Sequence, residues 1–317
     1  MFKKFCTIIA TILSIGFFWT PSTFALEAGD VVMSLNPSER DLELEPGETY
    51  ESNVGVSNVG RLPFDVHASV SPYYVSGDNY EPDFASESSY TKLHNWIKLE
   101  KDTYHLEPGE TVKVNFTVTV PEGVAGGGQY AAIMLLSDSG VEEEAAVKVQ
   151  GQLAAIIYGH VNGGEMVKSG ELVAHSLPGF MFNDKFAVSQ TVKNTGNVDF
   201  RVKQTMTVTD FFSNREVVNA DSVSSDGQMI GYNISSVLPG TSRTGILTWT
   251  DAPKLGLFNV KQTIAFLDQE YEYSQLVFIC PIWLIVLVIA LIIALIVWII
   301  FKIKNRGRRS ADRPQVY

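Results

Sequence analysis

An apolar run near the C-terminus constrains this chain more than any other feature. The run covers residues 276–301 and contains no charged residue. A helix rises ~1.5 Å per residue, so a helix of this length crosses the ~30 Å hydrocarbon core of a bilayer. We therefore predict one transmembrane helix over residues 276–301, which leaves the rest of the chain to fold outside the bilayer.

Basic residues follow the apolar run closely. Basic residues beside a membrane segment favour the cytoplasmic side, and the two indole rings near the ends of the run, Trp283 and Trp298, suit the lipid interface. We predict a cytoplasmic tail over residues 302–317 and a single-pass, type I protein in the plasma membrane with its N-terminal part extracellular. Binding of anionic lipid or a partner is the alternative role for these residues. The basic residues are Lys302, Lys304, Arg306, Arg308, Arg309 and Arg313, against one acid, Asp312.

The N-terminus has the three-part pattern of a secretory signal. Lys3 and Lys4 precede an apolar run over residues 5–19, and the small-x-small triplet Thr-Phe-Ala ends at Ala25. We predict that residues 1–25 are a signal peptide cleaved after Ala25. An uncleaved anchor is the alternative, but the run is shorter than the ~20 residues that a membrane span requires.

The remaining 250 residues, 26–275, are strongly acidic. The whole chain has a net charge of -11, two lysines precede this segment and a net charge of +5 follows it, so the segment itself carries -18. This charge disfavours nucleic acid as a partner and leaves basic proteins, cations and neutral glycans open. Both cysteines, Cys6 and Cys280, lie outside the segment. An exported segment of this size without disulfides favours a bacterial envelope.

The acidic segment has the pattern of an all-β protein. Runs rich in Val, Thr, Ile, Tyr and Phe alternate with Pro-Gly, Asn-x-Gly and Ser-Asp-Gly turns, a spacing typical of β-sandwiches. Residues 129–136 are apolar on both sides of the pleat, which predicts an inner strand. The predicted strands cover residues 50–57, 64–71, 111–120, 129–136, 145–160, 185–193, 198–209, 244–250 and 258–267.

A repeat divides the segment in two. VSNVGRLPFDV at residues 56–66 aligns without gaps with VKNTGNVDFRV at 192–202, and five of eleven positions are identical. Each copy precedes a Pro-Gly turn, at Pro108 and Pro239. We predict two tandem Ig-like β-sandwich domains, residues 26–161 and 162–273, with a single larger sandwich as the alternative. We expect Asn-x-Gly in each copy to supply residues that tolerate positive φ.

No catalytic or cofactor motif is recognisable, so we predict a protein that is not an enzyme and has no cofactor. The five histidines are isolated in the sequence and predict no zinc site: His67, His94, His105, His160 and His175. The acidic run at residues 142–144 is interpreted as a solvated hairpin tip, with calcium binding left open. Asn115 and Asn233 lie in formal glycosylation sequons, whose modification is also left open. The glycine triplet at residues 126–128 predicts a tight backbone bend.

Residues 71–95 form a long stretch without periodicity that is rich in aromatic rings. Long loops on sandwiches often carry function, and rings with polar groups suit glycan or protein contacts. We predict a candidate ligand-binding loop here; the alternative is that the rings cap the open end of the first sandwich. The residues are Tyr73, Tyr74, Tyr80, Phe84 and Tyr90.

The order of motifs resembles a known family. LEPGETY, VSNVGRLPFDV, SPYY, NWIKLE, LEPGETVKVNFTVTVPEG and GGGQYAAIML follow one another as in the N-terminal Ig-like domain of bacterial WxL-interacting surface proteins and related envelope proteins. The second half is similar to their membrane-proximal domain. The resemblance implies a non-enzymatic protein that bridges the cell wall or surface proteins and other ligands. The chain has no WxL signature or wall-sorting motif of its own.

We therefore expect a membrane-anchored surface protein that binds a surface protein, a cell-wall polymer or a neighbouring cell. One alternative is a membrane-tethered assembly chaperone that uses strand donation, which a long free edge strand would favour. The other is an unrecognised surface hydrolase, which requires two carboxylates facing one cleft.

Overall fold

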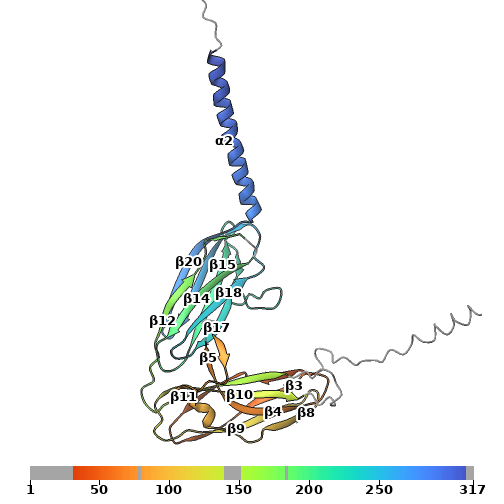
Figure 1. Ribbon diagram of the computed structural model, residues 1–317, viewed down its shortest axis with the longest axis vertical. Helices are drawn as coiled ribbons and strands as arrows, with labels where there is room; N and C mark the ends of the chain where they lie inside the picture. Colours follow the sequence, from red (N-terminus) through yellow and green to blue (C-terminus); the bar gives the residue numbers. More distant parts are fainter. Residues whose placement is uncertain (1–30, 77–79, 139–150, 183–184, 312–317) are drawn as a thin grey trace, which may run out of the picture.

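The computed structural model describes residues 31–76, 80–138, 151–182 and 185–311. The described chain is built of β-strands, apart from a short 3-10 helix and one long helix at the C-terminal end (Figure 1). The all-β fold with one apolar helix is therefore confirmed. The predicted signal peptide and the acidic run at residues 142–144 lie outside the described residues.

The first group of strands forms two facing sheets, which we call the N-terminal module. One sheet has the order β1 (Met33–Asn36), β3 (Thr49–Asn58), β9 (Thr111–Thr119), β7 (Ile97–Leu99). The other has the order β2 (Glu39–Leu44), β11 (Gln152–Val161), β10 (Gly127–Asp138), β4 (Phe64–Pro72), β8 (Thr103–Leu106). A small hairpin of β5 (Tyr74–Ser76) and β6 (Glu81–Asp83) and the 3-10 helix η1 (Lys92–Asn95) complete the module.

The second group forms the C-terminal module. Its smaller sheet has the order β12 (Gly170–Ser176), β14 (Phe186–Asn194), β18 (Ser242–Trp249). Its larger sheet has the order β13 (Phe180–Met181), β20 (Gln269–Ile279), β19 (Gly256–Phe266), β15 (Phe200–Asp210), β16 (Glu216–Val218), and β17 (Tyr232–Val237) also pairs with β15. Among the described strands, all pairings stay within one module.

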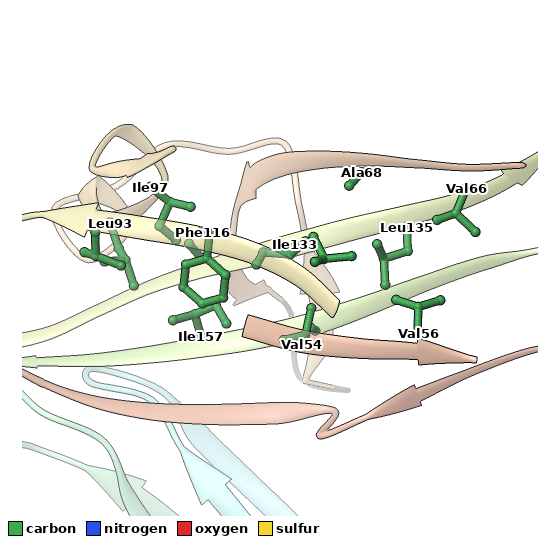
Figure 2. Close-up of a cluster of buried hydrophobic side chains, with 14 of the residues drawn as sticks. Val54, Val56, Val66, Ala68, Leu93, Ile97, Phe116, Ile133, Leu135 and Ile157 are labelled. Carbon is green, nitrogen blue, oxygen red and sulfur yellow. The ribbon is translucent and has the colours of Figure 1, made fainter. Parts of the chain in front are cut away.

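Alternating apolar residues build the core of the N-terminal module. Val114, Phe116 and Val118 of β9 are buried, while the residues between them lie outward, because successive side chains of a strand point to opposite faces. They pack against Ile133, Leu135 and Ile157 of the opposite sheet (Figure 2). β10 is buried on both faces, as its sequence predicts, because aromatic side chains of residues 73–90, together with Leu238 of the C-terminal module, cover its outer side.

Both modules begin with the same change of sheet. β1 runs antiparallel to β3, and β2 then runs parallel to β11 in the opposite sheet. In the C-terminal module β12 runs antiparallel to β14, and β13 then runs parallel to β20. The sequence repeat thus corresponds to a repeat of topology. The predicted domain limits themselves stay a prediction.

The repeated asparagines hold equivalent turns in the two modules. Asn58 Nδ2 donates to the carbonyls of Leu62 (2.8 Å) and Leu106 (3.1 Å). Asn194 Nδ2 donates in the same way to Val198 (2.9 Å) and Val237 (2.8 Å). Both side chains are fully buried, and each Oδ1 accepts the backbone N–H two residues on.

This arrangement corrects the expected role of the Asn-x-Gly motif. Neither of its glycines, Gly60 and Gly196, is among the residues with positive φ. Gly196 is required for a different reason: a Cβ there would lie 2.1 Å from the Val167 carbonyl oxygen. The Pro-Gly turns behave as their sequence predicts, since Gly109 and Gly240 have φ of 81° and 71°.

The C-terminal helix starts later than its apolar composition predicts. Residues 276–279 complete β20, because Val277 and Ile279 are buried in the core of the C-terminal module. Cys280 is buried too and lies between strand and helix, not inside the helix. Helix α2 covers Ile282–Ala311, and Ile282–Ile303 is long and apolar enough to span a membrane.

A polar layer divides the core of the C-terminal module. Gln190, Gln204 and Gln262 come from three different strands and are all at most 1% exposed. Each has apolar, buried residues two positions before and after it, which belong to two separate hydrophobic clusters. A buried amide loses its hydration on folding, so this layer lowers the hydrophobic contribution of the centre of the module.

We predict that Asn194→Ala lowers the free energy of unfolding by about 2–3 kcal/mol, because two buried hydrogen bonds, to the Val198 and Val237 carbonyls, and a half-buried one from the Gly196 N–H are lost. Urea unfolding measures this change. Asn95→Ala, at an exposed position of η1, is the control and should change stability by less than about 0.5 kcal/mol. Equal losses in the two variants would contradict the role of the buried turn.

Candidate functional site

The aromatic residues of the predicted loop lie at the junction between the modules. Tyr73 is buried, and Tyr74, Tyr80, Phe84 and Tyr90 are partly buried around it. The ring of Tyr74 stacks on Tyr90 with centroids 5.9 Å apart, and Tyr73 lies 5.8 Å from Phe84. The same cluster includes Tyr130, Tyr158 and, from the C-terminal module, Leu238. The structure therefore brings together all five residues of the predicted loop.

Two hydroxyls of the cluster bind the Pro-Gly turn of the C-terminal module. Tyr80 donates to the Ser236 carbonyl (3.0 Å) and accepts from the Leu238 N–H (2.8 Å), and Tyr74 donates to the Pro239 carbonyl. Burial raises the pKa of Tyr80 to about 12, so the hydroxyl keeps its proton at neutral pH. The guanidinium of Arg243 lies over the Tyr80 ring at 4.5 Å. These side chains contact the second module; a role in ligand binding stays a prediction.

A buried carboxylate forms the centre of the junction. Asp199 is 8% exposed, and its Oδ1 accepts from the Tyr130 hydroxyl at 2.9 Å and lies 2.9 Å from His160 Nε2. The Asp199 N–H in turn donates to the Tyr130 hydroxyl oxygen. His160 Nδ1 lies 3.1 Å from Glu43 Oε1. The hydrogen bond with Asp199 is the largest cause that raises the pKa of His160 to about 9, so an imidazolium joins two carboxylates at neutral pH.

Glycines allow the two backbones to approach each other beside this cluster. Gly128 N–H donates to the Asn197 carbonyl (2.8 Å), and Asn197 Nδ2 donates to the Gly126 carbonyl (3.3 Å). Gly127 has φ of 137°, and a Cβ there would lie 2.8 Å from the Asn197 oxygen. The glycine triplet is therefore a contact between modules in addition to a bend, which its sequence alone did not predict.

The junction also has a charged margin. Arg201 donates to Asp41 Oδ2 at 2.8 Å and lies 3.9 Å from Glu39 Oε2. A pocket of about 220 Å³ lies beside these groups. It is lined by Glu39, Arg201, Ile234, Ser235, Ser236 and Arg243. Its lining supplies hydroxyls and both signs of charge, which suits polar ligands.

A second feature of the molecule is the outer edge of β20. One side of this strand pairs with β19 along its whole length, and the other pairs with β13 only at Phe278 and Ile279. The Phe278 N–H donates to the Gly179 carbonyl, and the Cys280 N–H donates to the Met181 carbonyl of β13. Because successive residues of a strand direct their backbone groups to opposite sides, the N–H and C=O groups of the even-numbered residues of β20 face away from β19. Among the described strands, none pairs with this edge over residues 269–277. The outward N–H and C=O groups there are those of Glu270, Glu272, Ser274 and Leu276.

The other sequence candidates lie on separate elements, of which β4 with His67 and β8 with His105 are paired strands. His67, His94, His105 and His175 are on different elements, and His175 stacks on Tyr273 at 3.6 Å. Within the described ranges, no group of three or more His, Cys, Asp or Glu side chains could hold a metal ion. Of the sequon residues, Asn115 donates to Glu100 (2.7 Å) and Asn233 lies in β17. Their modification stays a prediction.

Comparisons with known proteins give distant likenesses of fold. No family model and no curated protein matches the chain. The class 5 fimbrial chaperone CfaA has 13% identity, covers 79% of this chain and 100% of its own, and has a TM-score of 0.38. The SafB chaperone in complex with the SafA pilin of Salmonella enterica has 11% identity, 78% and 98% coverage, and a TM-score of 0.38. The CsuC–CsuE chaperone–tip subunit complex of Acinetobacter baumannii has 11% identity, covers 71% of this chain and 92% of its own, and has a TM-score of 0.35.

We predict that His160 stabilises the folded protein in a pH-dependent way. Because folding raises its pKa from about 6.5 to about 9, its contribution is fully present below pH 6.5 and is lost as the pH rises through 9. The difference in unfolding free energy between wild type and His160→Gln should be on the order of 2 kcal/mol at pH 6 and close to zero at pH 10. Urea unfolding at both pH values measures it; a difference that grows with pH would contradict the ion pair.

We also predict that Tyr80→Phe lowers the unfolding free energy by about 1–2 kcal/mol, because the buried Leu238 N–H loses its partner and the Ser236 carbonyl retains only the Arg243 donor. Tyr90→Phe retains the ring that stacks on Tyr74 and should be nearly neutral. Chemical denaturation of the two variants checks this. If Tyr80→Phe were also neutral, the hydroxyl would not hold the modules together.

Proposed function

We propose that the chain is a membrane-anchored envelope protein that binds an extended segment of another surface protein along the free edge of β20. Helix α2 anchors it, and the C-terminal module presents the edge. Binding a strand in this way is the activity of an assembly chaperone, which we favour over adhesion to a cell-wall polymer. The observation that carries the proposal is the length of strand edge without a partner in the described part of the chain.

The edge has the geometry that strand addition needs. Its outward N–H and C=O groups lie at every second residue from Glu270 to Leu276, so an added strand completes a regular ladder. β20 has a continuous register with β19 and no bulge, so the edge is straight enough to pair. Main-chain hydrogen bonds would supply affinity for many sequences.

The acidic residues near the free edge of β20 restrict which partner segments can bind there. Glu270 and Glu272 are exposed on the edge strand, and Lys261 forms an ion pair with Glu272. These carboxylates disfavour an acidic strand and discourage pairing between two copies of the same edge. The net charge of -18 over residues 26–275 acts in the same direction. We therefore propose a neutral or basic extended segment as the partner.

The fimbrial chaperones and their complexes with pilin or tip subunits are similar in fold only, and the proposal is based on the residues of this chain. Membership of the WxL-interacting family also remains a proposal, based on the quoted motifs. The strand-binding proposal and the WxL-interacting resemblance both imply a surface protein as the partner. Extracellular placement of the modules and a cytoplasmic tail remain part of the proposal.

The test is Ser274→Pro in the full chain. Proline removes one outward N–H and leaves the ladder with β19 intact, since this residue does not donate to β19. A photo-crosslinking residue at exposed Gln275 captures the partner in cells, and mass spectrometry identifies the crosslinked segment. We expect Ser274→Pro to lower crosslinking to that segment about tenfold.

Ser274→Ala is the matched control, because it retains the N–H and should leave crosslinking unchanged. Equal melting temperatures of the two variants exclude a folding defect. Undiminished crosslinking in Ser274→Pro would overturn strand addition at this edge.

A further inference from the structure

Helix α2 leaves from one end of the C-terminal module (Figure 1). Several exposed aromatic and aliphatic side chains belong to segments at this end. We call them the membrane-side rim: Phe180, Phe182, Phe211, Phe212, Leu255 and Phe278. Soluble surfaces rarely expose contiguous apolar groups without a partner. Their function therefore depends on what lies against this end.

Strand register places the residues of the membrane-side rim at the same end of the larger sheet. Phe278 pairs with Phe180 on one side and with Leu257 on the other. Asp210 pairs with Phe258, and the Phe211 N–H donates to the Leu257 carbonyl. Phe211 and Phe212 therefore lie at the end of the sheet where β20 finishes, as does Leu255 immediately before β19.

A hydrogen-bonded turn holds the most exposed ring, that of Phe212, in solvent. Asp210 Oδ1 accepts from the N–H groups of Phe212 (3.1 Å) and Ser213 (2.8 Å) and from the Ser213 hydroxyl (2.7 Å). This turn fixes the backbone and leaves the Phe212 side chain 82% exposed. On the other edge, Phe180 contacts both Phe182 and Phe278, with centroids 4.7 and 5.4 Å apart.

The connection to α2 is too short to separate the rim from the bilayer. Only Cys280 and Pro281 lie between β20 and the helix, and the Cys280 N–H donates to Met181. Two residues span at most ~7 Å. The polar interface on each side of a bilayer is ~5–7 Å thick, so a span that begins at Ile282 puts the rim at headgroup depth. Aromatic side chains are favoured there.

We propose that the membrane-side rim inserts into the interface of the bilayer that α2 crosses and holds the C-terminal module against it. This inference rests on the proposed membrane anchorage. The occupant is lipid because the rim is continuous with the only helix among the described residues that is apolar enough to span.

The test uses the full chain with Cys6→Ser and Cys280→Ala, reconstituted into nanodiscs of phosphatidylcholine and phosphatidylglycerol. A nitroxide label is attached to Phe212→Cys, to Val59→Cys on the N-terminal module as a water-exposed control, or to Ile289→Cys in the helix. Electron paramagnetic resonance compares collision of each label with oxygen and with a water-soluble nickel chelate. An unchanged melting temperature of the cysteine-free background establishes that it is folded.

We expect the oxygen-to-nickel ratio at Phe212 to be several-fold above that at Val59 and below that at Ile289. A Phe212 label that behaves like Val59 while Ile289 reports lipid would overturn the rim and leave the anchorage intact. An Ile289 label accessible to nickel would overturn the anchorage and the rim together. A second label at Phe182→Cys should give the same result as Phe212.

Discussion

The hydrogen bonds of Asp199 are the constraint on which the arrangement of the two modules depends. The carboxylate comes from the C-terminal module, whereas Tyr130 and His160 come from adjacent strands of the N-terminal module. A buried carboxylate is costly unless it is paired and hydrogen-bonded, so separating the modules would leave both the carboxylate and the Tyr130 hydroxyl without partners. The turn that carries Asp199 is itself held by Asn194, whose side chain donates to the adjacent Val198 carbonyl. The repeated motif thus serves the junction as well as its own domain.

The sequence predicted the long strands well and the junction poorly. All nine predicted strands overlap observed ones, because alternation over eight or more residues, as in β9, is a strong local signal. β20 was missed because Val277 and Ile279 merge with the apolar run that follows, and hydrophobicity alone does not distinguish a buried strand end from a membrane helix. The short β1, β2 and β13 carry too few residues to show a period.

In the candidate site, too, local sequence patterns do not show which residues far apart in the chain contact each other. The aromatic loop was found from composition, but its contacts with Ser236 and Leu238 join residues more than 150 positions apart. Tyr130 and Asp199 are 69 positions apart, and although each lies within a quoted motif, neither motif indicates the contact between them. The glycine triplet predicts only a bend from its sequence, and the structure adds that the bend lets the Asn197 backbone approach closely.

The repeat also shows where the two modules differ, and the difference falls on the proposed binding edge. Both change sheets after their first strand, but β2 covers six residues of β11, whereas β13 covers two residues of β20. β20 is also one residue longer than β11. In the N-terminal module the first-strand extension closes most of the described edge; in the C-terminal module the same extension stops beside the membrane-side rim. An open edge costs unpaired backbone groups and a risk of aggregation, and Glu270 and Glu272 lower that risk without closing the edge. Two modules of one topology therefore differ in the exposure of one strand, and the exposed strand is connected through two residues to the helix.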